Sequence, residues 1–320
     1  MHNFKTPESD PNILSASLKW KDRASRVAAG IRLRVLEHTV KQNGGYLSQA
    51  CSSAEIFAAI YCKIMRTSEI LSPIMPGKFP GVPSPGKKLL TGACYNGEAG
   101  PEYDRFILSP AQYALVLYAT LIETGRMDPR GMAEYNRDGG IVEMIGAEHS
   151  PGMEVTTGSL GQGISQAAGI ALARKLRGDT GRMILLMSDG ECQSGQFWEA
   201  VQAISFHHLE NMLCFVDMNA CQCDGQMKTV MEMEPFHERL QAFGVTVHRV
   251  CGHDLDALVQ AAEKTVPGKA TFVLCDTDTC RGLDILKSRY PKFHYVRFKN
   301  ETERAAYEQV YKQMKENMEC

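Results

Sequence analysis

The segment 183–219 constrains the fold and chemistry of this chain more than any other part. It consists of an apolar strand ending in Ser188-Asp189-Gly190, a helix, and a second apolar strand ending in Asp217-Met218-Asn219. Ligands of open parallel sheets bind beyond the carboxyl ends of the strands, and neighbouring strands lie about 5 Å apart. The side-chain oxygens of Asp189 and Asn219 can therefore converge on one ion. Because Mg²⁺ takes oxygen ligands and commonly keeps phosphate oxygens in its shell, this segment indicates a metal–diphosphate site.

The rest of the chain alternates between strand and helix patterns, which is typical of a parallel sheet. We therefore predict a single-domain α/β fold: a mostly parallel sheet with helices on both faces. The Pro- and Gly-rich stretch 73–100 interrupts the pattern, and we expect this long loop to shape the mouth of the site. Expected strands span 106–108, 183–187, 213–217, 246–250 and 271–276, and expected helices span 21–41, 53–66, 111–123, 163–177, 195–206, 255–264 and 301–316.

Composition excludes several classes of function. The chain has 320 residues, 44% of them apolar and 22% charged, with a formal net charge of −2. This balance favours a soluble globular protein and gives no reason to expect a nucleic-acid partner or an anionic membrane surface. No apolar run approaches the roughly 20 residues of a membrane span, and the first residues lack the layout of a secretory signal. Eleven cysteines without such a signal favour a reducing, cytoplasmic location.

Each candidate group also has a purely structural interpretation. Asp189 could cap the helix that starts near Gly195, and Asn219 could be a turn residue. Capping alone would require neither Gly190 nor a partner at Asn219, so we prefer the metal interpretation. The Cys221-Gln222-Cys223 pair lacks the second ligand pair of a zinc site.

The glycine-rich turn 158–163 opens a helix, where anions are favoured. A dinucleotide fingerprint fails there, because Gln166 stands where a third glycine is required. Glycines that serve only helix packing remain an alternative.

An Asp-Gly pair followed thirty residues later by Asn resembles the thiamine diphosphate motif. The flanking segments DRFILS at 104–109 and EVTTGSLGQGIS at 154–165 are similar to the corresponding strand and cofactor loop of transketolases. The resemblance runs from about residue 20 to 298 and covers the diphosphate-binding domain of that family. It implies a thiamine diphosphate-binding fold at 21–298, preceded by an N-terminal arm at 1–20 and followed by a C-terminal helix at 299–320.

The resemblance also implies roles for individual residues. Asp189, Asn219 and the backbone carbonyl of Cys221 would bind Mg²⁺ or Ca²⁺. Gly158, Ser159 and Leu160 would pack near the aminopyrimidine end of the cofactor, and Ser188, Gly190, Glu191 and His294 would lie near its diphosphate. His294 would also contact substrate, although a surface histidine is an equal alternative.

The sequence departs from transketolases at the substrate positions. Tyr46 and Gln112 stand where the family places histidines that bind sugar hydroxyls, and His149 is near the place of a third. Tyrosine and glutamine can form hydrogen bonds but do not titrate near neutrality as histidine does. We assign Tyr46, Gln112 and His294 to catalysis. We expect the cofactor-binding residues to match those of transketolases and the sugar specificity to differ from theirs.

Transketolases activate thiamine diphosphate with a glutamate on a second, pyrimidine-binding domain. We therefore expect this chain to be the N-terminal subunit of a split, two-chain transketolase that is inactive alone and forms a heterotetramer with that partner. The reaction would transfer a two-carbon ketol unit from a ketose to an aldose, and the sugar need not be a standard one. The alternatives are the α subunit of a thiamine diphosphate-dependent 2-oxo acid dehydrogenase and a non-catalytic cofactor-binding subunit.

Overall fold

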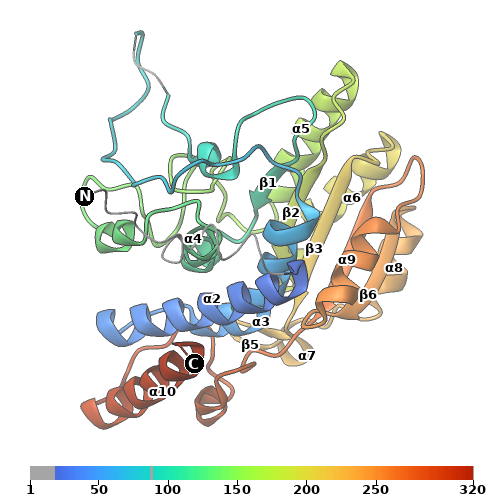
Figure 1. Ribbon diagram of the computed structural model, residues 1–320. Helices are drawn as coiled ribbons and strands as arrows, with labels where there is room; N and C mark the ends of the chain where they lie inside the picture. Colours follow the sequence, from blue (N-terminus) through green and yellow to red (C-terminus); the bar gives the residue numbers. More distant parts are fainter. Residues whose placement is uncertain (1–18, 87–88, 320) are drawn as a thin grey trace.

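A five-stranded, wholly parallel sheet forms the centre of the protein in the computed structural model, which describes residues 19–86 and 89–319 (Figure 1). The strand order is β1-β2-β3-β7-β6. The predicted strands are confirmed to within two residues at each end. Of the predicted N-terminal arm, all but residues 19 and 20 lie outside the described residues. The strands are β1 (Arg105–Leu108), β2 (Met183–Ser188), β3 (Met212–Met218), β6 (Thr246–Cys251) and β7 (Thr271–Asp276).

Helices cover both faces of the sheet, as predicted, because successive strand residues point to opposite sides. Phe106, Leu186 and Phe215 face a core shared with α2 (Trp20–Gln42), α3 (Leu47–Ala59), α4 (Ala114–Glu123) and α9 (Leu255–Glu263). Ile107, Leu185 and Cys214 face the other core. That second core is shared with α5 (Gly163–Arg177), α6 (Gly195–Phe206) and α8 (Phe236–Ala242).

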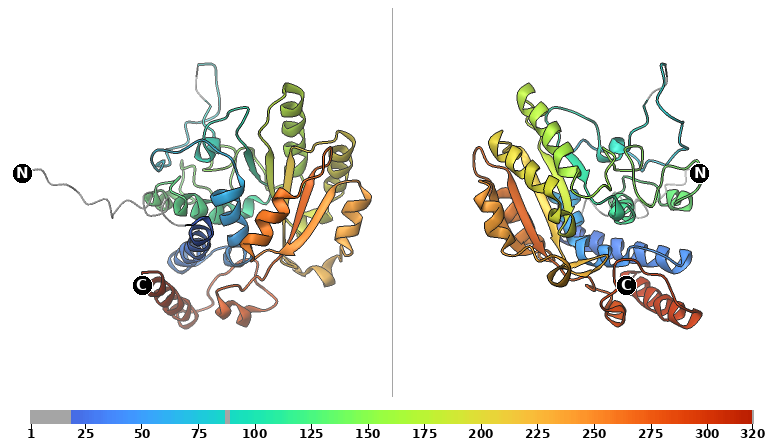
Figure 2. Two further views of the ribbon diagram at one scale, coloured as in Figure 1. Left: turned by 45° about the vertical axis from the view of Figure 1, so that its right-hand side comes forward. Right: turned by 180° about the vertical axis from the view of Figure 1, so that it is seen from behind.

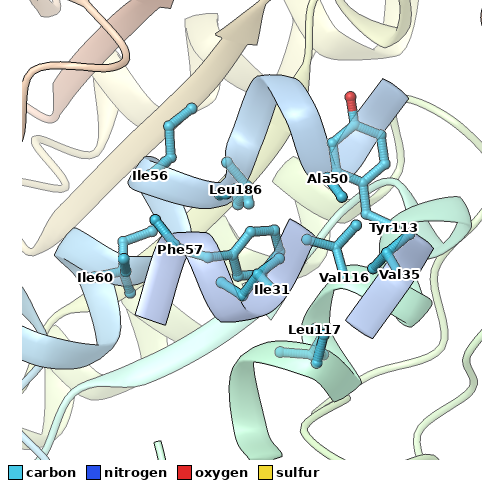
Figure 3. Packing of buried hydrophobic residues seen from close by; sticks show 14 of the residues in the cluster. Ile31, Val35, Ala50, Ile56, Phe57, Ile60, Tyr113, Val116, Leu117 and Leu186 are labelled. Atoms are coloured by element: carbon cyan, nitrogen blue, oxygen red, sulfur yellow. The ribbon is translucent and has the colours of Figure 1, made fainter. Parts of the chain in front are cut away.

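Helix α3 differs from the expected helix at 53–66. It begins at Leu47, and its last turn continues as a π-helix at Ile60–Ile64. All but one of its residues are buried, so the apolar stripe that marks a helix start in a half-exposed helix is absent here. Figure 3 shows the packing: Phe57, Ile60 and Ile31 of α2 lie below Leu186 of the sheet in this view, and Ile56 lies to its left.

The last helix, α10 (Glu301–Glu319), packs against α2. Its Tyr311 hydroxyl donates to the Glu37 carboxylate at 3.0 Å, and Tyr307 is almost fully buried. The segment is therefore not solvated on all sides. The smaller elements are the hairpin β4 (Cys221–Gln222) and β5 (Gly225–Gln226), helix α7 (Met227–Val230), and the 3-10 turns η3 (Gly92–Asn96), η4 (Ala111–Tyr113), η5 (Pro129–Glu134), η6 (Gly190–Gln193) and η7 (Asp284–Arg289).

The Pro- and Gly-rich stretch extends on the side of the molecule away from β6 (Figure 2). Across the described ranges, no helix combines the length and apolar character that crossing a membrane requires.

Candidate active site

A cavity of about 580 Å³ lies at the carboxyl ends of β2 and β3. Its walls come from the ends of these strands, the turn before α3, η4, the hairpin β4–β5 and the segment before α10. The lining residues are Tyr46, Ser48, Gln49, Pro110, Gln112, Tyr113, Leu160, Ser188, Asp189, Gly190, Glu191, Gln193, Asn219, Cys221, Gln222, Cys223, Asp224, Thr279, Pro291, Phe293, His294 and Tyr295. All the predicted metal residues and most of the predicted cofactor residues are therefore brought to one cavity.

Asp189 sits at its floor, immediately after β2. One carboxylate oxygen accepts the Gly190 N–H and the other accepts the Ala220 N–H, both at 2.8 Å. The second bond joins the end of β2 to the residue next to Asn219. The N-cap of α6 is Ser194, so Asp189 does not cap the helix that the alternative named; it caps the 3-10 turn η6 instead, through the bond from the Gly190 N–H. Burial, together with the negative charge of Asp217, raises the pKa of Asp189 to about 8. A cation beside this carboxylate would stabilise its ionised form.

The carboxamide of Asn219 is held on both sides. Its nitrogen donates to a carboxylate oxygen of Asp217 at 3.1 Å and to the Tyr113 hydroxyl at 3.3 Å. Its oxygen accepts the Cys221 N–H at 2.9 Å, which is the turn role that the sequence left open. An amide oxygen has two lone pairs, so one remains for another partner. The turn role and a ligand role are thus compatible.

Glu191 connects the two strand ends to the glycine-rich turn. Its carboxylate accepts the Ser188 N–H at 2.8 Å, the Ser109 hydroxyl at 2.5 Å and the Gly161 N–H at 3.1 Å. The side chain is buried, and burial raises its pKa. Through these hydrogen bonds Glu191 holds the glycine-rich turn against the two strand ends.

The glycine-rich turn presents only one of its three predicted cofactor residues to the cavity. Leu160 lines the wall and is 47% exposed. Ser159 is exposed outside the wall, and Gly158 packs behind it, where an added Cβ would lie 3.2 Å from Ala111. The positive φ of Gly158, 102°, shows why glycine is needed at this position.

His294 and Tyr46 meet at the other end of the cavity, although they are far apart in sequence. An isolated bridge between Gly45 and Val296 brings their segments together. The two rings make an edge contact with centroids 5.5 Å apart, and the Gln49 amide donates to the His294 carbonyl at 3.1 Å. Burial lowers the pKa of His294, which favours its neutral imidazole.

The Pro- and Gly-rich loop and His149 lie elsewhere. Phe79 and His149 stack with ring centroids 4.6 Å apart and line a separate, smaller cavity. No described residue of 73–100 lines the large cavity, so the expectation that this loop shapes its mouth is wrong. His149 likewise does not take the place of a substrate histidine; it contacts Glu143 at 3.2 Å.

Comparison with known proteins decides the family. The family described as "Transketolase, thiamine diphosphate binding domain" matches residues 93–288. The chain belongs to the transketolase family. It is 38% identical over 198 residues to a transketolase family protein of Sinorhizobium fredii, and the match covers 61% of this chain and 71% of the relative.

Two kinds of transketolase relative differ in how much of their length is matched. The 6-deoxy-6-sulfo-D-fructose transketolase subunit SqwG of Clostridium sp. is 29% identical, covering 88% of this chain and 94% of the relative. A solved transketolase from Pichia stipitis has the same fold, with a TM-score of 0.66 and 21% identity. The match covers 93% of this chain but 45% of that chain, so this protein spans less than half of the solved enzymes that it matches.

The donor set of the cavity fits the thiamine diphosphate and cation that a transketolase domain implies. The buried Asp189 carboxylate has no basic partner in the cavity wall, whose described residues include no lysine or arginine. The side-chain oxygens of Gln112 and Gln222 are buried there without a hydrogen-bond partner among the described residues. Buried polar atoms are rarely left unsatisfied, so both indicate a polar ligand. Gly190 has no side chain at this wall, and an added Cβ would make only an ordinary contact with Gln222, at 3.4 Å.

The described residues hold no cluster of three or more His, Cys, Asp or Glu that could bind a metal ion. The predicted set would not form such a cluster, because it consists of one carboxylate, one carboxamide and one carbonyl.

Sequence reasoning missed the groups beneath Asn219. Asp217 is fully buried, and its carboxylate accepts hydrogen bonds from the hydroxyls of Ser52 and Thr277, at 2.6 and 2.5 Å. A carboxylate two residues before Asn219 at a strand end was a usable signal. No pattern in the sequence around Ser52 or Thr277 marks them as site residues. The packing of α3 brings Ser52 to Asp217, and the order of the strands in the sheet brings Thr277 there.

Proposed function

We propose that this chain is the diphosphate-binding subunit of a two-chain transketolase that transfers a two-carbon ketol unit from a ketose to an aldehyde acceptor. Mg²⁺, or Ca²⁺ in its place, would be held by Asp189, Asn219 and the carbonyl of Cys221. One observation carries the proposal: the Asp189 carboxylate bonds to the N–H of Ala220 at 2.8 Å, beside Asn219, at the floor of a 580 Å³ cavity.

The chain's own residues have separate tasks. When bound, thiamine diphosphate supplies the thiazolium carbon that attacks the carbonyl and serves as the electron sink. Asp189 and Asn219 would hold the cation that neutralises the diphosphate, and the Gly190 backbone would let that group approach closely. Leu160 would pack near the aminopyrimidine end of the cofactor. His294 would offer a hydrogen bond at the substrate end of the cavity.

A second protein chain would complete the cofactor site. It would carry the pyrimidine-binding domain and the activating glutamate, in a heterotetramer with two copies of each chain. Relatives support this arrangement, because SqwG is named as a subunit of a transketolase and is matched over 94% of its length. An apulose-4-phosphate transketolase subunit of Actinobacillus succinogenes, 30% identical, is matched over 71% of its length and 61% of this chain.

The sugar specificity would differ from that of enzymes with histidines at the substrate positions. Tyr46 and Gln112 line the cavity and present a phenol and an amide. Both donate and accept hydrogen bonds but do not carry protons reversibly near neutrality. A donor ketose with a non-standard substituent or skeleton suits such a wall. We also propose a cytoplasmic location, supported by the ten cysteines among the described residues that form no disulfide.

The test is co-expression of this chain with a candidate pyrimidine-domain subunit, followed by cofactor analysis and a ketol-transfer assay with several ketoses and aldehydes. Asp189→Asn should abolish Mg²⁺-dependent activity. Asp284→Asn is the matched control, because Asp284 is 86% exposed and pairs with Lys287 on the surface. Oxidative decarboxylation of 2-oxo acids with a lipoamide acceptor would favour the dehydrogenase alternative. A complex that holds thiamine diphosphate but transfers no ketol unit would favour the non-catalytic alternative.

A further inference from the structure

We propose that Asp217 is a positioning residue that determines which atom of the Asn219 carboxamide faces the cation. This inference rests on the proposed function, since it concerns how the same site is built. Asn219 is useful as a ligand only through its oxygen, and a rotation of the amide by half a turn would present its nitrogen instead. A cation site with an asparagine ligand therefore needs something to choose the orientation.

The contacts of Asp217 make that choice in one direction. Its carboxylate accepts four hydrogen bonds: from Ser52 at 2.6 Å, Tyr113 at 2.9 Å and Asn219 at 3.1 Å on one oxygen, and from Thr277 at 2.5 Å on the other. In each of these four bonds an oxygen of Asp217 is the acceptor, so this side of the site offers the Asn219 amide an acceptor and not a donor. The side of the Asn219 amide that faces Asp217 must therefore be its NH₂ group.

The opposite side of the amide meets the reverse requirement. The Cys221 N–H points at the Asn219 oxygen at 2.9 Å. If the amide were reversed, its oxygen would face the Asp217 carboxylate and its NH₂ group would face the Cys221 N–H. Both hydrogen bonds would be replaced by repulsive contacts, so a single orientation is stable. In that orientation the oxygen lies on the side of Cys221, whose carbonyl is the third proposed ligand.

Asp217 is itself fixed by rigid parts of the fold. Its partners come from α3, from η4 and from the residue after β7, and the carboxylate is fully buried between them. Figure 3 shows the Tyr113 ring among apolar side chains, with its hydroxyl at the far end, away from Val116 and Leu117. The hydroxyl cannot leave its place without moving a ring that is 4% exposed. The orientation of the Asn219 amide is thus set by the hydrophobic core.

The proposal makes an unusual prediction for Asn219→Asp. A carboxylate is ordinarily a better ligand for Mg²⁺ or Mn²⁺ than an amide. Here the new carboxylate would face Asp217 oxygen to oxygen and turn away, so cation binding should weaken. Asp217→Asn should weaken it as well, because an amide keeps only one of the two acceptor oxygens, which now accept from Asn219 and from Thr277. The double variant Asp217→Asn with Asn219→Asp exchanges the two groups and allows the hydrogen bond to form in reverse.

The experiment measures Mn²⁺ binding by calorimetry or electron paramagnetic resonance on the full-length chain in complex with thiamine diphosphate and its partner protein. We expect each single variant to lose roughly 10- to 100-fold in Mn²⁺ affinity, the usual effect of removing a group that orients a ligand. The double variant should bind at least tenfold more tightly than the product of the two losses predicts. Additive losses, or an Asn219→Asp variant that binds as tightly as wild type, would overturn the role of Asp217.

Thr120→Val is the matched control, because it also removes a buried hydroxyl hydrogen bond, to the Val116 carbonyl at 2.8 Å, at a residue that does not line the cavity. It should keep Mn²⁺ affinity within about threefold of wild type, even if thermal unfolding without metal shows a loss of stability. An equal loss of affinity in Thr120→Val and Asp217→Asn would mean a general structural effect and would refute the proposal. If the wild-type complex itself binds no Mn²⁺ with the cofactor, the proposed function fails and not only this positioning role.

Discussion

Three glycines around helix α5 differ in their surroundings, and alanine substitutions there should have effects of different size and sign. Gly161 lies in the cofactor turn just before the helix, Gly169 lies in its interior, and Gly178 is its C-cap. The chemical change is the same at each, so the local structure alone determines the outcome. We expect Gly161→Ala to be the most destabilising of the three.

The magnitude for Gly161 follows from its geometry. Its φ is +85°, where an L-residue costs about 1 kcal/mol or more. An added Cβ would overlap the Oγ of Ser194 and lie 3.0 Å from its Cβ. Ser194 cannot turn away freely, because its Oγ caps α6 by accepting the Phe197 N–H at 3.4 Å. Loss of a cap costs about 1 kcal/mol, and overpacking adds about 1–3 kcal/mol. The sum is roughly 3–5 kcal/mol.

The other two glycines serve as matched controls. Gly178 has a φ of +76° with nothing within 4 Å of the added Cβ, so its alanine variant should lose only the conformational term of about 1 kcal/mol. Gly169 has equally open surroundings and lies within the regular helix. In a helix interior alanine is better than glycine, so Gly169→Ala should stabilise the protein by about 0.5–1 kcal/mol.

Urea unfolding of the three variants measures the free energy of unfolding, and a thermal shift with thiamine diphosphate and Mg²⁺ measures cofactor binding. We expect Gly161→Ala to lose the cofactor-dependent shift as well, because the displaced turn carries Leu160. The reasoning is refuted if Gly161→Ala is no less stable than Gly178→Ala, or if Gly169→Ala is the most damaging.

Three further predictions concern single side chains. Burial lowers the pKa of His38 to about 4, so the unfolded chain takes up its proton first as pH falls. Stability should drop by up to about 3 kcal/mol between pH 6.5 and 4, and His38→Gln should flatten this part of the unfolding profile. Glu191→Gln must set its NH₂ group against the N–H of either Ser188 or Gly161, which should cost about 1–3 kcal/mol in chemical denaturation; an unchanged midpoint would contradict the hydrogen-bond pattern. His294→Ala should lower kcat/KM of the complex roughly tenfold, with partial recovery in His294→Gln; equal activity of all three proteins would exclude a substrate contact.

Local patterns in the sequence predicted most of the fold. The strands could be placed because each is a short apolar run bounded by turn residues. Strands β2 and β3 could be predicted to lie side by side because a single helix connects them. This adjacency also predicts that Asp189 and Asn219, at the ends of the two strands, lie close together. Helix α3 could not be placed correctly, because a helix buried on nearly all sides shows no amphipathic period.

Tertiary structure alone decided how the site is completed. The insertion of β7 between β3 and β6 brings Thr277 to Asp217, and the packing of α3 brings Ser52 there. The pairing of Tyr46 with His294 depends on contacts between segments about 250 residues apart, namely the bridge between Gly45 and Val296 and the hydrogen bond from Gln49 to His294. A sequence specifies contacts between neighbours through short-range periodicity, and such contacts were predictable. Contacts between distant segments depend on which core each helix covers, and that is settled only when the whole chain has folded.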